Sequence, residues 1–290
     1  MVFRHSFPSR PSRVRKPLPY GGAAPSPCHT AAMTHMANGM HEPGRSDDAG
    51  PARTSWPRYG VDAPGFVSTL GAAAAAFGLA SVRWRRGRAV TAAAGALLTA
   101  GTGIYLHTTL RGKLAIWEKE LDRAGLKGDE ELLDLGCGRG AVLVAAAERL
   151  PDGKAVAVDL WAGKDQSGNR PEITLANAAA AGVADRVEVH TADMTALPFA
   201  DDSFDVVTSA LAIHNIEPPE LQYQALDEAM RVLRPGGRLI VADFWFAARR
   251  YVAHLGGDST LRPLGPGYWY GSPLLGINLV QATKKDSRRT

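Results

Sequence analysis

Residues 132–140 read LLDLGCGRG and run directly into the helical stretch AVLVAAAERL at 141–150. A buried strand that ends in closely spaced glycines and opens a helix brings bare backbone and a positive helix end up to a ligand. Side chains at Gly136, Gly138 and Gly140 would fill that space, so glycine is the residue such a site needs. The stretch therefore predicts a strand, a glycine loop and a helix around a small ligand.

A second predicted strand, Lys154–Asp159, ends in a carboxylate 19 residues after Gly140. A carboxylate at that strand end is placed to accept hydrogen bonds from both hydroxyls of a ribose. Gly136, Gly138 and Ala141 also satisfy the pattern G-x-G-x-x-A, which alone is a weak fingerprint of dinucleotide enzymes. A nicotinamide-dependent oxidoreductase is therefore an alternative at this point.

The chain from about residue 115 alternates short apolar runs with helical stretches, which is typical of an α/β domain. Glycine, proline and aspartate separate the pieces. The helices are predicted at 141–149, 171–181 and 219–233. The strands are predicted at 131–135, 154–159, 187–191, 204–209, 238–244 and 277–283.

Four motifs in this order resemble the class I S-adenosylmethionine-dependent methyltransferases, particularly the branch that includes the ubiquinone and menaquinone methyltransferases. LLDLGCGRG resembles the first motif and AVAVDL at 155–160 the second. HTADMTALPFADDSFDVVTSALAIHNI at 190–216 resembles the third and fourth, and RVLRPGGRLIVADF at 231–244 resembles the segment around the fifth strand. Four ordered motifs are more specific than a single glycine pattern.

This resemblance implies a doubly wound, mostly parallel seven-stranded sheet of Rossmann-like type, with the strand 277–283 antiparallel to the rest. The implied cofactor is S-adenosyl-L-methionine. Asp134 would hold the glycine loop and the amino group of the cofactor, and Asp159 its ribose hydroxyls. The other implied cofactor contacts are the three glycines, Leu160 and Met194 on the adenine ring, Asp193 at the adenine amino group, and Ser209 with Ala210 at the methionine end.

Two features near the implied site allow more than one interpretation. The segment WAGKDQSGNR at 161–170 is longer than the usual turn of the family, and is either a lid with Trp161 and Gln166 as contacts or a surface insertion. His214 follows the fourth strand and is our candidate catalytic base, since a neutral imidazole can take a proton during methyl transfer. A hydrogen-bonded structural histidine is the alternative, because aligning the activated donor with the acceptor can suffice.

Other clusters of reactive residues point to no further chemistry. Asp201, Asp202 and Asp205 fit a solvated turn and a strand start rather than the acid pair of a hydrolase. Cys137 is predicted to be a packing residue. The sulfur- and histidine-rich segment 28–41 could hold copper, but its irregular spacing favours a compositional origin, and we predict no metal site in the C-terminal domain.

Composition divides the 290 residues into three parts. Residues 1–58 are rich in proline, arginine, serine and glycine without apolar periodicity, and are predicted to be disordered; Met33, Met36 and Met40 are possible alternative starts. Residues 59–113 are predicted to form two apolar helices, and 114–290 the α/β domain. From residue 114 onward 25 acidic residues outnumber 19 basic ones, which argues against a nucleic-acid partner.

Two uncharged stretches, Pro64–Val82 and Ala89–Leu110, flank the basic loop RWRRGR at 83–88. Their 19 and 22 residues are enough to span a bilayer, although alanine and glycine dominate them. The arginines would keep the loop in the cytoplasm, which conflicts with a cytosolic cofactor if both segments span. We expect membrane association through residues 64–110, with the catalytic domain facing the cytoplasm; a helical hairpin packed on a soluble domain or a partner is the alternative.

The expected function is methyl transfer from S-adenosylmethionine to a small, lipophilic acceptor of the quinone, isoprenoid or lipid class. The lipophilic character is inferred from the membrane segment. A non-catalytic cofactor-binding membrane protein is a third class that fits the same motifs.

Overall fold

The computed structural model describes residues 58–257 and 259–286, all within one compact unit. The predictions for residues 1–57, namely disorder, alternative starts and the sulfur- and histidine-rich segment, lie outside the described residues.

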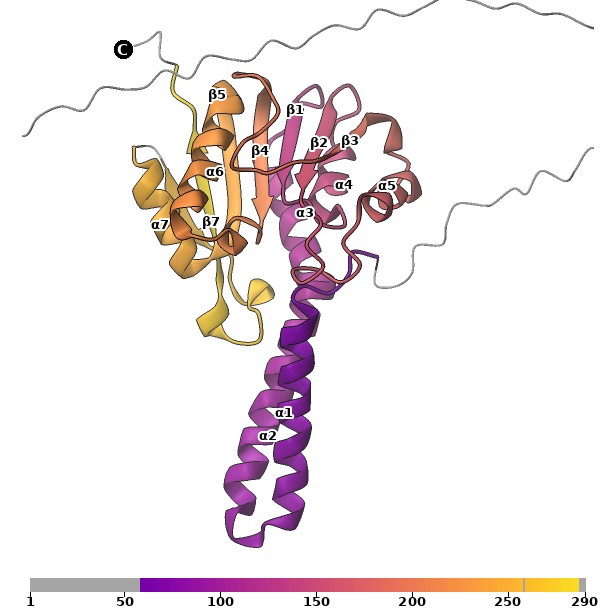
Figure 1. Cartoon of the computed structure of the whole chain (residues 1–290), viewed down its shortest axis with the longest axis vertical. Coiled ribbons are helices and arrows are strands. Elements are labelled where there is room, and N and C mark those ends of the chain that lie inside the picture. Colours follow the sequence, from indigo (N-terminus) through magenta and orange to yellow (C-terminus); the bar gives the residue numbers. More distant parts are fainter. Residues whose placement is uncertain (1–57, 258, 287–290) are drawn as a thin grey trace, which may run out of the picture. The chain divides into compact units, whose positions relative to one another are not determined.

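A seven-stranded sheet forms the centre of the α/β domain (Figure 1). Its strand order is β3-β2-β1-β4-β5-β7-β6. The pairs from β3 to β5 are parallel, while β7 is antiparallel to both β5 and β6. The strands are β1 (Glu131–Leu135), β2 (Lys154–Asp159), β3 (Val187–Thr191), β4 (Phe204–Ala210), β5 (Leu233–Phe244), β6 (Thr260–Pro263) and β7 (Ile277–Thr283).

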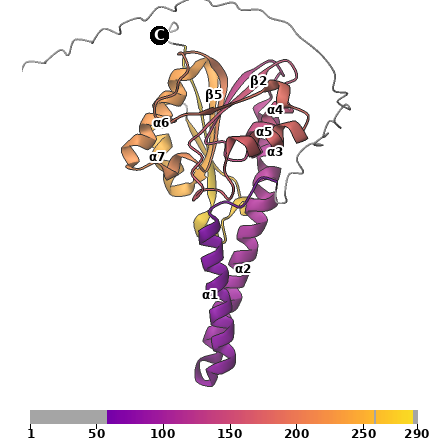
Figure 2. The same ribbon diagram turned by 45° about the vertical axis from the view of Figure 1, so that its right-hand side comes forward.

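Helices cover both faces of this sheet, as Figures 1 and 2 show. Because side chains alternate along a strand, neighbouring residues of β1 enter opposite cores. Leu132 packs in one buried cluster with α3 (Lys113–Ala124), α4 (Ala141–Ala147) and α5 (Pro171–Ala180). Leu133 packs in the other with α6 (Pro219–Val232) and α7 (Trp245–Leu255).

The predicted α/β fold is confirmed, including the seven strands and the antiparallel last strand. The predicted bounds of β1, β2, β3 and β7 agree with the structure, whereas β5 begins five residues earlier than predicted, at Leu233. Sequence reasoning gave no bounds for α3, α7 or the four-residue edge strand β6.

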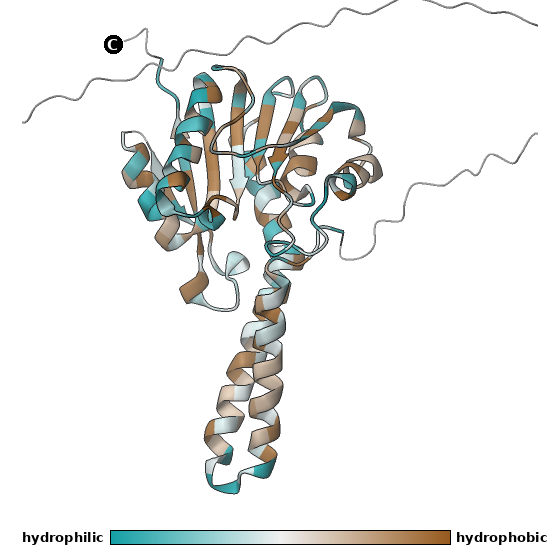
Figure 3. Cartoon of the chain, in the orientation of Figure 1, coloured by the Kyte–Doolittle hydropathy of each residue, from teal (hydrophilic) through white to brown (hydrophobic). Residues whose placement is uncertain are grey.

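The two apolar stretches form a pair of packed helices, α1 (Pro64–Arg83) and α2 (Arg88–His107). Each has 20 residues, about 30 Å of helix and close to the thickness of a bilayer core. Large apolar side chains are exposed along both helices, among them Leu79 (68%) and Leu97 (74%). In Figure 3 the two helices are coloured mostly brown to white, and the turn at 83–88 that joins them is hydrophilic.

α2 is continuous with the first helix of the α/β domain. A π-helical turn, Thr108–Gly112, joins α2 to α3, so that one helical segment runs from Arg85 to Ala124. This segment crosses the predicted domain boundary at 113/114 and ends where Gly125 takes a left-handed conformation. The hairpin and the α/β domain therefore share a helix rather than a linker.

Candidate functional site

A cavity of about 410 Å³ lies at the carboxyl ends of β1, β2 and β4. In a doubly wound sheet this edge, where the strand order reverses, is the expected place for a ligand. Its wall contains the glycine loop after β1, the ends of β2 and β4, and the segment after β3. The predicted site residues in the wall are Asp134, Gly136, Gly138, Asp159, Leu160, Asp193, Met194 and Ala210, together with Gln166 of the 161–170 segment.

The glycine loop is required by both conformation and space. Gly136, Gly138 and Gly140 have φ values of +69°, +54° and +80°, which side chains rarely adopt. A Cβ on Gly136 would lie 2.2 Å from that of Ala212, and one on Gly138 would lie 2.4 Å from Gln166 Oε1. Larger residues would therefore displace the cavity wall at the first two positions.

Asp134 is buried beneath the loop with an incomplete set of partners. Its Oδ1 accepts a hydrogen bond from Thr208 at 2.8 Å, while its Oδ2 is buried and has no partner among the described residues. Burial, aided by the Asp159 carboxylate, raises the pKa of Asp134 to about 7, although the Thr208 bond opposes the shift. A positively charged hydrogen-bond donor in the cavity would satisfy Oδ2 and stabilise the ionised carboxylate.

Asp159 closes the end of β2 over the glycine loop. Its Oδ2 accepts from the Gly138 amide at 2.8 Å, and its Oδ1 accepts from the Trp161 amide at 2.6 Å and Asn169 Nδ2 at 3.2 Å. The buried Asn169 Oδ1 has no described partner. The segment 161–170 thus supplies polar groups to the carboxylate that we expect to bind ribose.

Asp193, Met194 and Leu160 form another part of the wall. Asp193 Oδ1 caps the following turn by accepting from the Thr195 amide at 2.9 Å and its hydroxyl at 2.8 Å. Leu160 is 62% exposed, so its side chain is available to an incoming ring.

Three predicted site residues do not line the cavity. Gly140 packs beside Thr174, and Ser209 is fully buried with its hydroxyl donating to Leu135 O at 3.0 Å. The side chain of His214 is 21% exposed, and its Nδ1 lies 2.8 Å from Asp243 Oδ1 but outside hydrogen-bond geometry. The His214 amide donates to the other oxygen of the same buried carboxylate at 3.2 Å.

Sequence reasoning missed several cavity residues, among them four that lie outside the predicted motifs: Asp62, Lys113, Trp117 and Tyr268. Asp62 precedes α1, and the next two lie at the start of α3 and one turn later. Tyr268 lies in the loop between β6 and β7, and nothing in the sequence ties that loop to the glycine loop. Asp62 lies in the cavity because its two neighbours, Val61 and Ala63, form backbone hydrogen bonds with Ser167 and Asp165. These partners are more than 100 residues away in the sequence, and no local pattern indicates their pairing.

The α/β domain is similar to proteins of known family. Residues 133–241 match the methyltransferase domain family. The ubiquinone/menaquinone biosynthesis C-methyltransferase of Roseobacter denitrificans is 38% identical over 130 residues, 44% of this chain and 48% of that protein. The demethylmenaquinone methyltransferase of Clavibacter sepedonicus is 40% identical over 115 residues, 40% of this chain and 41% of that protein. Residues 133–241 thus resemble a methyltransferase domain, in agreement with the prediction, and the chain spans about half the length of the curated relatives that it matches.

Solved structures were also compared. A geranyl diphosphate methyltransferase in complex with S-adenosylmethionine aligns with a TM-score of 0.49 and 21% identity, over 62% of this chain and 87% of that one. An S-adenosylmethionine-dependent methyltransferase from Aquifex aeolicus aligns with a TM-score of 0.47 and 20% identity, over 58% and 89%.

Proposed function

We propose that this protein transfers a methyl group from S-adenosylmethionine to a small-molecule acceptor. The observation that carries the proposal is the unpartnered, buried Oδ2 of Asp134 beneath a glycine loop, within a methyltransferase domain. An ammonium group supplies the donor that this oxygen lacks. The glycine loop leaves its backbone open to the ligand, so the residues present fit this cofactor. When bound, the cofactor supplies an already activated methyl group on a sulfonium.

The remaining cavity residues have distinct roles in this proposal. Asp159 binds the ribose hydroxyls, which requires its bonds to Gly138 and Trp161 to be shared or exchanged. Asp193 receives the adenine amino group on the oxygen that does not cap its turn. Leu160 and Met194 pack against the adenine ring. Gly140 and Ser209 act from behind the wall by shaping it.

His214 is our candidate base for acceptors that lose a proton on methylation. The buried Asp243 carboxylate beside its Nδ1 would orient the ring and stabilise the imidazolium that forms. Because the ring does not line the cavity, this role requires the acceptor to extend beyond the cavity. A His214→Ala variant should lose turnover and keep donor binding.

We propose further that the acceptor is lipophilic, of the quinone, isoprenoid or lipid class, and that the protein meets it at a membrane. Both α1 and the helical segment Arg85–Ala124 are long and apolar enough to cross a bilayer. Leu114 and Trp117, on the helix that continues α2, line the cavity. A lipid-soluble acceptor would thus find an apolar surface that leads from the hairpin to the site, with the catalytic domain facing the cytoplasm.

Labelled methyl transfer tests this function directly. The full chain in detergent would be incubated with S-adenosylmethionine labelled in its methyl group and with fractionated quinones, isoprenoids and lipids, and the products analysed by mass spectrometry. We expect label in an apolar fraction with the wild type and none with Asp159→Ala. Label confined to water-soluble products would contradict the lipophilic acceptor, and label in no fraction would contradict the methyltransferase activity.

A further inference from the structure

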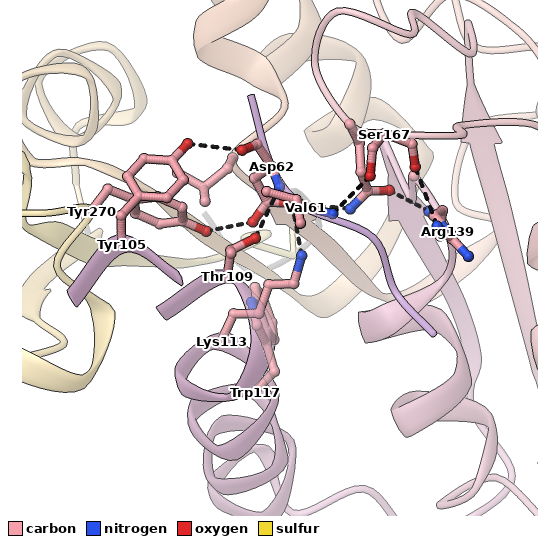
Figure 4. Close-up of polar contacts among 12 residues, drawn as sticks. Val61, Asp62, Tyr105, Thr109, Lys113, Trp117, Arg139, Ser167 and Tyr270 are labelled. Carbon is pink, nitrogen blue, oxygen red and sulfur yellow. Dashed lines mark hydrogen bonds and ion pairs between the residues drawn. The ribbon is translucent and has the colours of Figure 1, made fainter. Parts of the chain in front are cut away.

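A buried ion pair joins the base of the hairpin to the cavity. Asp62 Oδ1 lies 2.7 Å from Lys113 Nζ, and its Oδ2 accepts from the Tyr270 hydroxyl at 2.7 Å. The backbone oxygen of Asp62 accepts from the Tyr105 hydroxyl at 2.9 Å, and its amide donates to Thr109 at 2.9 Å (Figure 4). Asp62, which precedes α1, is therefore held by residues within the shared helical segment and by Tyr270 after it.

The two charged side chains are 17% and 8% exposed. Burial alone would raise the pKa of Asp62, but the Lys113 ammonium and the hydrogen bonds from Lys113, Tyr270 and Gln166 hold it below its ordinary value, so the carboxylate is ionised. Removing two charges from water is costly, and a buried ion pair is weak evidence of a purely stabilising role. Asp62 and Lys113 both line the cavity, so the pair is placed where a bound ligand could contact it.

Gln166 connects this ion pair to the glycine loop. Its Nε2 donates to Asp62 Oδ1 at 3.0 Å, and its Oε1 accepts from the Arg139 amide at 2.7 Å. The segment before α1 is also bonded to the 161–170 segment that carries Gln166, since the Ser167 amide donates to Val61 O at 3.0 Å. The ion pair is therefore fixed relative to the glycine loop.

The cavity wall carries more acidic than basic side chains. Carboxylates dominate it, and its cations are Lys113, which is buried, and Lys164, which is exposed. Within residues 58–257 and 259–286, Asp62 Oδ1 is the hydrogen-bond acceptor of Lys113 Nζ, so two of its three N–H groups have no protein acceptor. A carboxylate entering the cavity would complete the coordination of this ammonium.

We infer that Lys113 binds the carboxylate of the amino-acid end of the methyl donor, and that Asp62 positions Lys113 for this contact. The inference rests on the proposed function, which gives the ammonium of the same zwitterion to Asp134. A zwitterion in this wall needs a cation as well as an anion, and Lys113 is the buried cation available. The donor site is then completed by residues outside the matched segment 133–241.

Two ligands that differ in the amino-acid end test this assignment. S-adenosylhomocysteine carries the zwitterion, whereas 5′-methylthioadenosine keeps the nucleoside and thioether without it. Isothermal titration of the full chain in detergent should show that Lys113→Met weakens S-adenosylhomocysteine by at least about tenfold, the scale of one charged hydrogen bond. The same substitution should leave the affinity for 5′-methylthioadenosine unchanged.

Further variants separate binding from folding. Lys113→Met leaves Asp62 unpaired, so the double variant Asp62→Asn/Lys113→Met removes both charges and should show the same ligand-selective loss. Lys113→Arg keeps the charge and should retain the preference for S-adenosylhomocysteine. Asp152→Asn, at an exposed carboxylate before β2 on the opposite edge of the sheet, is the control and should bind both ligands as the wild type does.

Each outcome decides between the two proposals. An equal loss of both ligands in the double variant, or no loss of either, would overturn the role of Lys113 while the methyl-donor site stands. A folded wild type that binds neither ligand would overturn the proposed function and this inference with it.

Discussion

Asp134 lies in the proposed donor site, and its burial makes the ionised carboxylate unfavourable in the ligand-free fold. Its pKa is raised from 3.8 to about 7, mainly by burial, so the folded chain holds this proton more tightly than the unfolded chain does. The contribution of this proton to the stability of the folded chain is complete below pH 3.8 and is lost as the pH rises through about 7.

We therefore predict that Asp134→Asn stabilises the ligand-free protein at pH 8 relative to the wild type, with a smaller difference at pH 5. Thermal unfolding at both pH values measures the effect. Thr208→Val, which removes the hydroxyl donor to Asp134, is a useful comparison. If the melting temperatures of Asp134→Asn and wild type differed by the same amount at both pH values, the raised pKa that we attribute to burial of Asp134 would be contradicted.

The same titration should govern ligand binding. Because the proposed ammonium contact needs an ionised Asp134, the affinity for S-adenosylhomocysteine should rise from pH 6 to pH 8 in the wild type. In Asp134→Asn the affinity should be weak at both values. Isothermal titration at a fixed ionic strength provides this comparison, and a wild-type affinity that falls over the same range would speak against the contact.

At the residue scale the sequence predicted the part of the cavity that is local to strand ends. Asp134, Asp159 and Asp193 lie in or just after the carboxyl ends of recognisable strands, and parallel strands bring these ends to one edge. Asp62 and Lys113 could not be found in this way. Their place depends on Val61–Ala63 pairing with 165–167, a contact set by the three-dimensional fold of the 161–170 segment.

At the element scale, the helical segment shared by hairpin and domain determines how the two join. Gly112 lies where α3 begins, and a Cβ there would be 2.1 Å from the backbone oxygen of Gly267. That oxygen belongs to the backbone of the turn Pro266–Tyr268. The clash is therefore with backbone, and no flexible side chain can move aside to relieve it. Close approach of two backbones therefore explains glycine at this position.

We predict that Gly112→Ala lowers the melting temperature and also weakens donor binding, because Tyr268 and Lys113 both line the cavity. The control is Gly103→Ala in α2, where a Cβ meets nothing within 4 Å. An exposed helix interior gains about 0.5–1 kcal/mol from this exchange, so the control should be neutral or stabilising. Equal melting temperatures for the two variants would contradict the proposed backbone contact.

Elements with strong local signals were predicted, and elements stabilised by their neighbours were not. β1 and β2 are continuous apolar runs bounded by turn residues, so their bounds agree. β6 has four residues, none of them buried, and exists because it pairs with β7. No apolar alternation marks such an edge strand, and its prediction would require knowing the position of β7.

At the scale of the whole molecule, the exposed apolar surface of α1 and α2 is the feature without a partner among the described residues. Soluble monomers rarely expose contiguous apolar surface of this length. We predict that the wild type floats with liposomes and that the double variant Leu79→Asp/Leu97→Asp does not, since a charge in the bilayer core costs about 2.5–3.5 kcal/mol.

The control for this experiment is Leu274→Asp, at a side chain that is 79% exposed but lies in the loop between β6 and β7 of the α/β domain. It should float with liposomes as the wild type does. All three proteins should bind S-adenosylhomocysteine equally, because none of the substituted residues lines the cavity. Flotation of the double variant would show that the hairpin is covered by something other than lipid.

The most direct test of the central claim is isothermal titration of the full chain with S-adenosylhomocysteine, in parallel with Asp159→Ala. The full chain is needed because Asp62 and Lys113 complete the cavity from outside the matched domain. We predict saturable binding by the wild type and its loss in Asp159→Ala. A folded wild type that does not bind S-adenosylhomocysteine, or that binds NAD in its place, would contradict the account.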